Sequence, residues 1–451
     1  MPALSRRALL AATAGAWAAG RARAAASDAA PGTLREVDVA IVGAGAAGIA
    51  AARRILAAGR RCVLLEGSGR IGGRCVTDLS AFGGPFDRGA HWLHRPTRNP
   101  LVRLARELGL EVYPAPPEHG LRIGARPATR SEHAELKAAL LRAHQGIDRA
   151  AEAQEDRSLA QALPADLGSW QATVEFLLGP FDCAREAAEV SAQDFAESDE
   201  NGEDAFCRRG YGTLLARLAD GLPVRLGIRV GRLTASGRGV ELQTSAGALR
   251  AGAAIVTAST AALLAGGLRF EPEPVAHLGA AAQLQLGSYD HIVLELPGNP
   301  LGLRADELVF EKAAGPRTAA LLANVGGTAL CQIDVAGRFG HGLAAAGEQA
   351  MIAFGRDWLA GLFGSSVRGA IRRAAATRWD HDPWARGAYS AAAPGAQAAR
   401  RVLMQPLDEG RRVWLAGEAA HETLWGTVGG AWLSGERAAA AVLQALGPPA
   451  R

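Results

Sequence analysis

Val37-Asp38-Val39-Ala40-Ile41-Val42 runs directly into Gly43-Ala44-Gly45-Ala46-Ala47-Gly48, and these twelve residues indicate the fold class. The first six residues read as a short apolar strand, and the Ala-rich segment after the glycines reads as a helix. In such a strand–loop–helix unit Gly43 permits the tight turn, Gly45 lets backbone amides approach a pyrophosphate, and Gly48 lets helix and strand pack closely. The sequence therefore predicts an α/β fold with a Rossmann-type dinucleotide-binding domain.

The next strand and loop distinguish between dinucleotides. Cys62-Val63-Leu64-Leu65 ends in Glu66, at the spacing where a carboxylate accepts hydrogen bonds from an adenosine ribose, which argues against a 2′-phosphate there. Glu66 is followed after a short loop by Gly72-Gly73-Arg74, and this resembles the second fingerprint of the glutathione-reductase-type flavoproteins. Arg74 can neutralise the pyrophosphate or contact the flavin. FAD is the cofactor that this segment implies.

Two segments near the C-terminal end of the sequence carry a family resemblance. Val413-Trp414-Leu415-Ala416-Gly417-Glu418-Ala419 reads as a strand and turn, and 426–437 (GTVGGAWLSGER) as a loop entering a helix. Together they resemble the flavin amine oxidase family. The resemblance implies that Glu418 lies near the ribityl phosphate, and that the backbone at Thr427 and Val428 lies at the edge of the flavin ring.

Three further blocks resemble the same family. Residues 88–94 (RGAHWLH) look like its stretch beside the isoalloxazine, 379–390 (WDHDPWARGAYS) is close to a segment of polyamine-oxidase-like members, and 224–264 resembles the strand-rich return to the FAD domain. Val230 is a candidate for backbone contacts to adenine. The resemblance thus assigns cofactor binding to Gly43, Gly45, Ala46, Ala47, Gly48, Glu66, Gly73, Arg74, Gly89, Ala90, His91, Trp92, Val230, Trp384, Gly417, Glu418, Thr427 and Val428.

The resemblance also implies a reaction. A flavin amine oxidase removes hydride from the carbon beside a neutral amine nitrogen, and water later hydrolyses the imine to an aldehyde or keto product. Tyr389 falls at one wall of the family's aromatic cage, and Trp425 is our candidate for the opposite wall because Leu424 occupies the usual aromatic position. Ala388 stands where covalently flavinylated members have a cysteine, so we expect non-covalent FAD.

His291 is the main departure from the family. The corresponding segment usually carries a lysine that holds a water against the reactive flavin nitrogen. His291 could hold such a water and take a proton from it, or it could be a structural substitute with slow reaction toward oxygen. The electron acceptor is therefore either O2 or a periplasmic carrier. With Tyr389 and Trp425, His291 completes the expected catalytic set.

The first 26 residues read as a twin-arginine signal peptide. Arg6-Arg7 precedes an apolar run from Ala8 to Ala19 and the small-residue segment Ala22-Arg23-Ala24. That export route carries folded proteins, so FAD could be acquired before export. We expect the mature protein in the periplasm, with no stable membrane insertion after cleavage.

The composition limits the classes of molecule that we expect the protein to bind. With Lys+Arg 49 against Asp+Glu 45 and no long basic run, nucleic acid is not an expected partner. Five cysteines form no CxxC pair, and no metal site is indicated. The expected ligand is a small-molecule amine, and the sequence leaves its identity open.

The chain is long enough for two domains. We expect a discontinuous FAD domain at 34–115, 205–272 and 390–448. An α+β substrate domain is expected at 116–204, helical to about Ala196, and at 273–389. Two alternatives remain open: a C–C desaturase or protoporphyrinogen-oxidase-like enzyme, and a flavoprotein whose FAD serves only as an electron relay.

Overall fold

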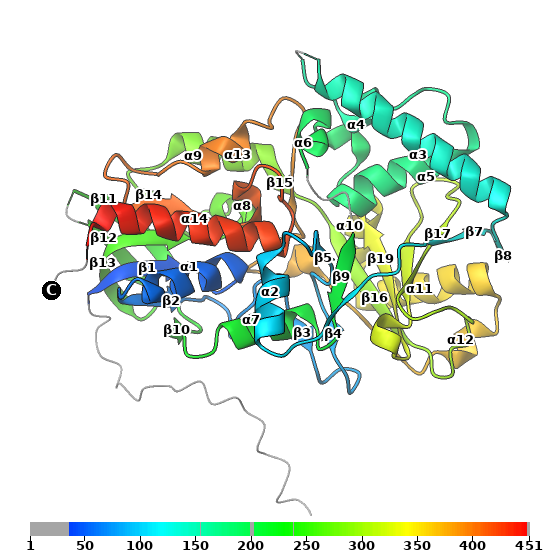
Figure 1. Cartoon of the computed structure of the whole chain (residues 1–451), viewed down its shortest axis with the longest axis horizontal. Coiled ribbons are helices and arrows are strands. Elements are labelled where there is room, and N and C mark those ends of the chain that lie inside the picture. Colours follow the sequence, from blue (N-terminus) through cyan, green and yellow to red (C-terminus); the bar gives the residue numbers. More distant parts are fainter. Residues whose placement is uncertain (1–35, 154, 199–202, 238, 449–451) are drawn as a thin grey trace, which may run out of the picture. The chain divides into compact units, whose positions relative to one another are not determined.

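The computed structural model describes residues 36–153, 155–198, 203–237 and 239–448, so the expected leader at 1–26 lies outside the described residues. Two large sheets, one of eight strands and one of seven, organise the described chain (Figure 1). The model thus has the mixed α/β architecture that the sequence predicts.

The eight-stranded sheet contains the nucleotide-binding strands. Its parallel part comprises β10 (Val224–Arg225), β2 (Cys62–Leu65), β1 (Val37–Val42), β13 (Gly247–Val256) and β22 (Val413–Leu415). An antiparallel extension from β13 comprises β12 (Gly239–Thr244) and β11 (Val230–Ser236), followed by β14 (Arg269–Glu271), parallel to β11. Strands from both ends of the described chain therefore meet at β13.

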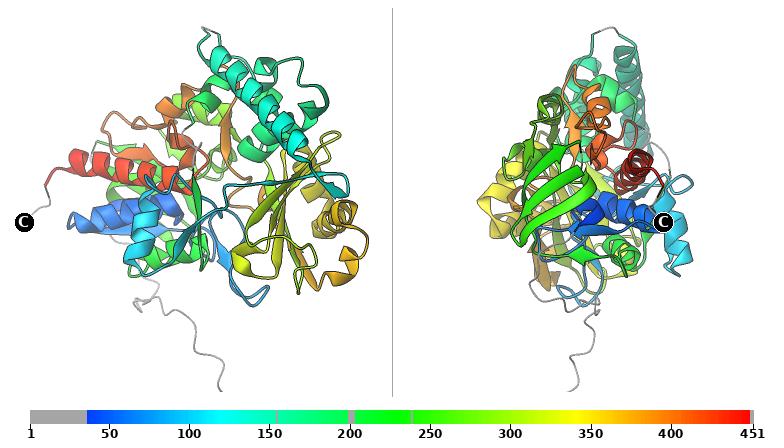
Figure 2. Two further views of the ribbon diagram at one scale, coloured as in Figure 1. Left: turned by 45° about the vertical axis from the view of Figure 1, so that its right-hand side comes forward. Right: turned by 90° about the vertical axis from the view of Figure 1, so that its left-hand side faces the viewer.

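Helices cover both faces of this sheet, because successive side chains in a strand point to opposite sides. Val39 and Ile41 of β1 belong to the apolar cluster beneath α1 (Ala46–Ala57) and α14 (Val428–Leu446), the blue and red helices that lie side by side in Figures 1 and 2. Ala40 belongs to the cluster on the other face. The helices there are α8 (Thr260–Leu264), α9 (Val275–Gln283) and α13 (Ala399–Leu403).

The seven-stranded sheet lies between two helical layers. Its strands, in order, are β20 (Arg373–Ala376), β16 (Tyr289–Glu295), β19 (Leu330–Ala336), β18 (Ala320–Ala323), β17 (Glu307–Glu311), β7 (Gly120–Ile123) and β8 (Arg126–Pro127). One face packs on α10 (Gly337–Ala346), α11 (Glu348–Phe363) and α12 (Val367–Ala370). The other face packs on the helical segment of α3 (Arg130–Ala151), α4 (Leu159–Ala162), α5 (Gln171–Phe176), a π-helical turn (Leu177–Phe181) and α6 (Ala192–Ala196).

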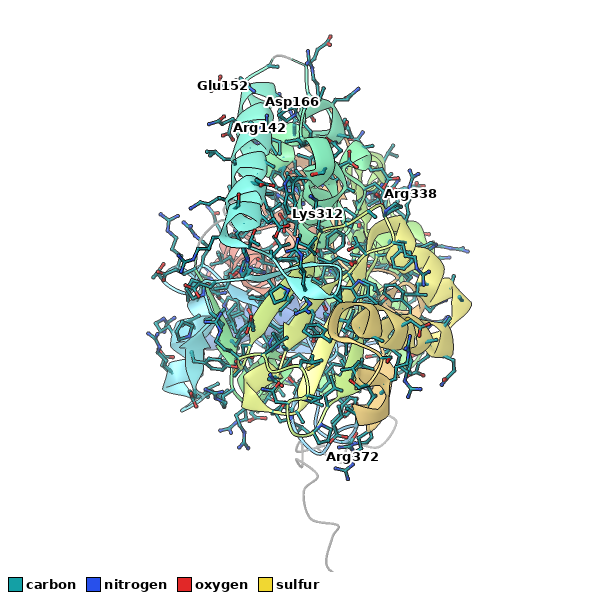
Figure 3. All side chains as sticks on the ribbon, turned by 90° about the vertical axis from the view of Figure 1, so that its right-hand side faces the viewer. Arg142, Glu152, Asp166, Lys312, Arg338 and Arg372 are labelled. Carbon is teal, nitrogen blue, oxygen red and sulfur yellow. The ribbon has the colours of Figure 1, made fainter. Side chains whose placement is uncertain are left out.

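The expectation of a helical segment throughout 116–196 is wrong at its start. Residues 120–127 form β7 and β8 at the edge of the seven-stranded sheet, where Leu121 is buried opposite Phe310 of β17. Two strands of four and two residues are too short to give an alternation pattern, so their pairing with β17 decides their structure. Beyond them the segment is helical, and Arg142 of α3 pairs with Asp166 at 2.8 Å (Figure 3).

Short strands and helices complete the fold around the site. They are β3 (Thr77–Asp78) with β4 (Phe86–Asp87), β5 (Leu93–His94) with β9 (Asp204–Cys207) and β6 (Val112–Pro114), β15 (Leu284–Leu286) with β21 (Ser390–Ala392), and the helices α2 (Pro100–Glu107) and α7 (Tyr211–Leu218). The described residues from 36 onward group as one unit, so the expected boundaries between an FAD domain and a substrate domain stay a prediction.

All five cysteines are buried. Within the described ranges, none of the helices combines the length and the apolar character needed to cross a bilayer.

The close approach of α1 and α14 depends on Gly435. A Cβ at this position would lie 2.1 Å from the carbonyl oxygen of Ala47, which is backbone and cannot turn away. We expect Gly435→Ala to lower the free energy of unfolding by about 1–3 kcal/mol, as overpacking does. Urea unfolding followed by circular dichroism measures the change.

Gly342→Ala is the matched control, because Gly342 is an exposed glycine of α10 with open space around its Cβ position. This variant should be unchanged or more stable by up to about 1 kcal/mol. Equal stabilities for the two variants would contradict the proposed contact.

Candidate active site

One cavity of about 980 Å³ brings the separate sequence blocks together. Its lining includes every residue that the sequence assigned to the site except Gly48. Those residues are Gly43, Gly45, Ala46, Ala47, Glu66, Gly73, Arg74, Gly89, Ala90, His91, Trp92, Val230, His291, Trp384, Tyr389, Gly417, Glu418, Trp425, Thr427 and Val428. Gly48 has the packing role expected of it, because a Cβ there would lie 2.0 Å from the carbonyl oxygen of Gly43.

At the nucleotide end, backbone atoms of the loop 43–48 and of the start of α1 form the wall of the cavity, and we call this wall the cradle. Gly43 has φ +104°, and a Cβ there would lie 2.3 Å from Oγ1 of Thr257, so the tight turn requires glycine. Helix α1 begins after Gly45 with no side-chain cap, which leaves first-turn amides available to a phosphate. Glu66 accepts hydrogen bonds from the amides of Ala44 at 2.9 Å and Ser68 at 2.8 Å, which aims its carboxylate along the loop.

Two more glycines keep this end open enough for a dinucleotide. The amide of Gly72 donates to Ala44 at 2.9 Å, so the second loop lies against the first. The ring of Trp384 lies where a Cβ of Gly67 would be, at 2.1 Å, and forms an outer wall. These bare backbone walls, an anion-binding helix start and an acidic side chain fit the adenosine and pyrophosphate of FAD.

Glu418 is a buried carboxylate at the flavin end. It accepts hydrogen bonds from Arg74 at 3.0 Å, from the hydroxyl of Ser390 at 2.7 Å and from the amide of Gly426 at 3.1 Å. Burial would raise the pKa of Glu418, but Arg74, Ser390 and Arg400 outweigh that effect and hold the pKa below its usual value. Glu418 is thus ionised and occupied by protein partners, and Arg74 lies beside it rather than alone in the cavity.

Trp425 lines the cavity above a buried ion pair. Arg400 and Asp194 are each 1% exposed and bond twice, at 2.6 and 2.7 Å. The guanidinium lies 4.6 Å from the centre of the Trp425 ring, and the indole N–H donates to the Asp194 carbonyl at 3.3 Å. The position of this wall is therefore fixed by the ion pair as well as by packing.

Tyr389 forms another part of the wall and is held by its hydroxyl. The O–H group lies 3.2 Å from the carbonyls of both Phe181 and Asp182, at the end of the π-helical turn. Its ring lies 6.0 Å from that of Tyr289, which also lines the cavity. No sequence motif marks Tyr289 or the lining residues Phe181, Phe195 and Phe310, because lone aromatic residues in strands and helices read as core.

Both ring nitrogens of His291 are engaged. Nδ1 lies 2.6 Å from Asp334, and Nε2 lies 2.9 Å from the carbonyl oxygen of Gly89. Burial would lower the pKa of His291, but Asp334 outweighs burial and the pKa is raised. Since both partners accept, both nitrogens donate and the ring is an imidazolium. Of the two alternatives for His291, this geometry favours the structural substitute over a residue that holds a water.

The remainder of the cavity, which we call the substrate end, is formed by 119–204 and 289–310. Here Asp204 pairs with His94 of the neighbouring β5 at 2.9 Å, and the exposed His119 and His133 mark an opening to solvent. The other walls are largely apolar: Leu121, Leu136, Leu140, Leu177, Leu178, Phe181, Phe195, Leu308 and Phe310. His119 and His133 lie in no motif, so the sequence could not place them here.

The site and fold agree with the comparisons to known proteins. The family model "Flavin containing amine oxidoreductase" matches residues 46–443, and the chain belongs to this family. FAD as cofactor, and an oxidoreductase of the amine oxidase class, are confirmed at the level of the family.

Relatives in rice differ in length from this chain. Polyamine oxidase 4 of Oryza sativa subsp. japonica is 26% identical over 434 residues, covering 89% of this chain and 87% of the relative. Lysine-specific histone demethylase 1 homolog 3 of Oryza sativa subsp. indica is 28% identical over 444 residues, covering 90% of this chain and 54% of the relative. The chain thus spans about half the length of that demethylase homolog.

Solved structures share the fold. Cyclohexylamine oxidase from Brevibacterium oxydans IH-35A has a TM-score of 0.76 at 22% identity, covering 90% of this chain and 99% of that one. Wild-type putrescine oxidase bound to putrescine also has a TM-score of 0.76, at 19% identity, covering 91% of this chain and 99% of that one.

Breaking the buried ion pair should be costly. We expect Asp194→Asn to lower the free energy of unfolding by about 3–5 kcal/mol, because Arg400 would remain buried without its charge partner. Denaturant unfolding measures this, with Glu107→Gln as control, since Glu107 pairs with Arg103 on the surface and such pairs contribute at most about 1 kcal/mol. A loss below that of the control would contradict the structural role of the pair.

Proposed function

We propose that the protein oxidises an amine by transferring hydride from the carbon alpha to the nitrogen to FAD, giving an imine that water hydrolyses to an aldehyde or ketone. The observation that carries the proposal is the single cavity in which the GxGxxG cradle continues into a chamber walled by Tyr389 and Trp425. Bound FAD would supply the hydride acceptor. A C–C desaturase or a relay protein would need no such aromatic chamber.

The chain's residues have three tasks in this reaction. The amides at Gly43 to Ala47 and the carboxylate of Glu66 would hold the nucleotide, and the backbone around Thr427 would hold the ring edge. Tyr389 and Trp425 would orient the carbon that reacts. Their apolar faces would also exclude water and disfavour the protonated amine.

The substrate end supports a primary or secondary amine with an apolar body. Among the described residues that line it there is no lysine or arginine, so a substrate carboxylate would lack a charged partner. A diamine is the second candidate, because Asp182 and Asp204 could accept a distal ammonium group and a relative is named a polyamine oxidase.

We propose a periplasmic carrier, such as a cytochrome or copper protein, as the electron acceptor in preference to O2. Support comes from His291, which replaces the family lysine and has both nitrogens engaged within the protein. The twin-arginine leader predicted at 1–26 supports the same compartment.

Anaerobic bleaching of the flavin tests the reaction. Purified holoprotein should lose its visible flavin band within seconds to minutes when arylalkyl or alkyl amines are added, and more slowly with diamines and amino acids. Admission of oxygen should restore the band slowly, and an added oxidised cytochrome should restore it faster. If the band is present but no amine bleaches it, C–C desaturation or relay replaces amine oxidation.

Export is tested separately. With Arg6 and Arg7 both changed to Lys, we expect the protein to accumulate in the cytoplasm with FAD bound, because the twin-arginine route requires the arginine pair. Fractionation of cells followed by flavin fluorescence measures the distribution. Unchanged periplasmic accumulation would contradict this route.

A further inference from the structure

Asp334 is a buried carboxylate that lies behind the wall of the large cavity. It belongs to β19, is 1% exposed, and lies directly opposite His291 of the antiparallel strand β16. Tyr289 lies two positions before His291 and therefore on the same face of that strand. Within the described residues, the lining of the large cavity includes Tyr289 and His291 but not Asp334. Asp334 thus contacts two wall residues from outside the cavity.

Three donors share this carboxylate. Oδ1 of Asp334 lies 2.6 Å from Nδ1 of His291 and accepts from the side-chain amide of Gln332 at 2.9 Å. Oδ2 accepts from the hydroxyl of Tyr289 at 3.0 Å. Both oxygens therefore act as acceptors, as those of an ionised carboxylate do.

The second nitrogen of His291 meets another acceptor, the carbonyl oxygen of Gly89, at 2.9 Å. A neutral imidazole has one N–H group, so it could donate to Asp334 or to Gly89 but not to both. In the neutral ring, one lone pair would face an oxygen atom. The charge on His291, and not its position alone, is what permits both contacts.

The Gly89 carbonyl belongs to a closely packed part of the flavin end. A Cβ at Gly89 would lie 2.1 Å from the carbonyl oxygen of Arg74, and the amide of Ala90 donates to that same oxygen at 3.1 Å. The side chain of Arg74 in turn donates to Glu418. A shift of the Gly89 peptide would therefore also move the backbone of Arg74.

Tyr289 is held by the same carboxylate but in a way that does not depend on the charge of His291. Its ring lies 5.8 Å from that of His291, edge to face, and 6.0 Å from that of Tyr389. Burial and, next, Asp334 raise the pKa of Tyr289 well above its usual value, so the phenol remains a neutral donor.

We propose that Asp334 is a positioning residue for the flavin end of the cavity. It keeps His291 charged, and the charged ring holds the carbonyl of Gly89. The same carboxylate holds the ring of Tyr289 beside Tyr389. Loss of the His291 proton removes one of the two contacts of that ring, so the wall is fully held only while His291 is charged.

The direction of the pH dependence follows from the groups around His291. Burial lowers the pKa of His291, but Asp334 outweighs burial, and Asp290 on the opposite face of β16 acts in the same direction, so the pKa is raised. Burial raises the pKa of Asp290 itself to about 7. Tyr289 is neutral and Gln332 does not titrate. The contribution of His291 is thus complete below its unfolded pKa of about 6.5 and is lost as the pH rises through the raised folded value.

The first test is 15N NMR of histidine-labelled holoprotein without substrate, with the His291 signal assigned from His291→Gln. At about pH 7 we expect both ring nitrogens of His291 to be protonated, and only one of them in Asp334→Asn. Tyr289→Phe should leave both protonated, because it removes a hydroxyl and no charge. A neutral His291 in the wild type at this pH would overturn the proposal, even if Asp334→Asn does not fold.

The second test is the dissociation constant for FAD, measured by flavin fluorescence from about pH 6 to 10. At about pH 7, Asp334→Asn should weaken binding by about 3- to 10-fold, since one hydrogen bond to a charged group is lost. The difference from the wild type should narrow at alkaline pH, where the wild type has lost the same proton. A constant factor at every pH would mean that Asp334 is only structural and would overturn the proposal.

Glu295→Gln is the matched control for Asp334→Asn. Glu295 is a buried carboxylate of β16 in the same sheet, it pairs with Arg373 at 2.6 Å, and it lines neither the large cavity nor the small one of about 40 Å³. We expect this variant to keep the wild-type affinity for FAD and its pH dependence. An equal loss of affinity in Glu295→Gln would contradict a specific role of Asp334.

The third test is anaerobic flavin reduction by a saturating amine, and this test alone rests on the proposed function. Asp334→Asn should slow reduction by about 10-fold at about pH 7, and the deficit should narrow at alkaline pH. If reduction and its pH profile stay as in the wild type, Asp334 does not position the reacting groups, although amine oxidation stands. If no amine reduces the wild type, the proposed function fails, and the NMR and FAD-binding measurements decide the role of Asp334.

Discussion

The buried pair of Asp194 and Arg400 is the interaction on which the shape of the cavity depends. Its two bonds and near-complete burial make it a charge pair that is stabilising only while both partners are present. Arg400 also donates to the hydroxyl of Ser390 at 3.2 Å, and Ser390 donates to Glu418. Through Glu418 the chain of contacts reaches Arg74. The helical segment, the flavin end and the nucleotide loops thus share one charge-balanced network.

The nucleotide end could be predicted from the sequence because its determinants are local. Strand, glycines, helix and Glu66 lie within about 30 residues, and each acts through backbone geometry that its own residue type sets. Gly43 and Gly48 also have the separate roles that the sequence predicts. The tight turn requires Gly43, and the packing of the helix on the strand requires Gly48. The second fingerprint is equally local.

The substrate end could not be predicted in the same way, because its contacts join distant parts of the chain. Arg400 meets a carboxylate 206 positions away, and Nε2 of His291 meets a carbonyl 202 positions away. Neither contact leaves a periodic pattern or a motif. Strands β7 and β8 illustrate the same limit for secondary structure, since pairing with β17 outweighs any local preference of so short a segment.

The crossing of α1 and α14 has a consequence for biosynthesis. The anion-binding start of α1 rests on a helix near the far end of the described chain, and strands β1 and β22 reach the same sheet from opposite ends of the sequence. The phosphate cradle therefore gains its supporting layer only after about residue 446 has left the ribosome. A nascent chain that has not yet reached α14 would have the glycine loop of the cradle but not the helix that packs against α1.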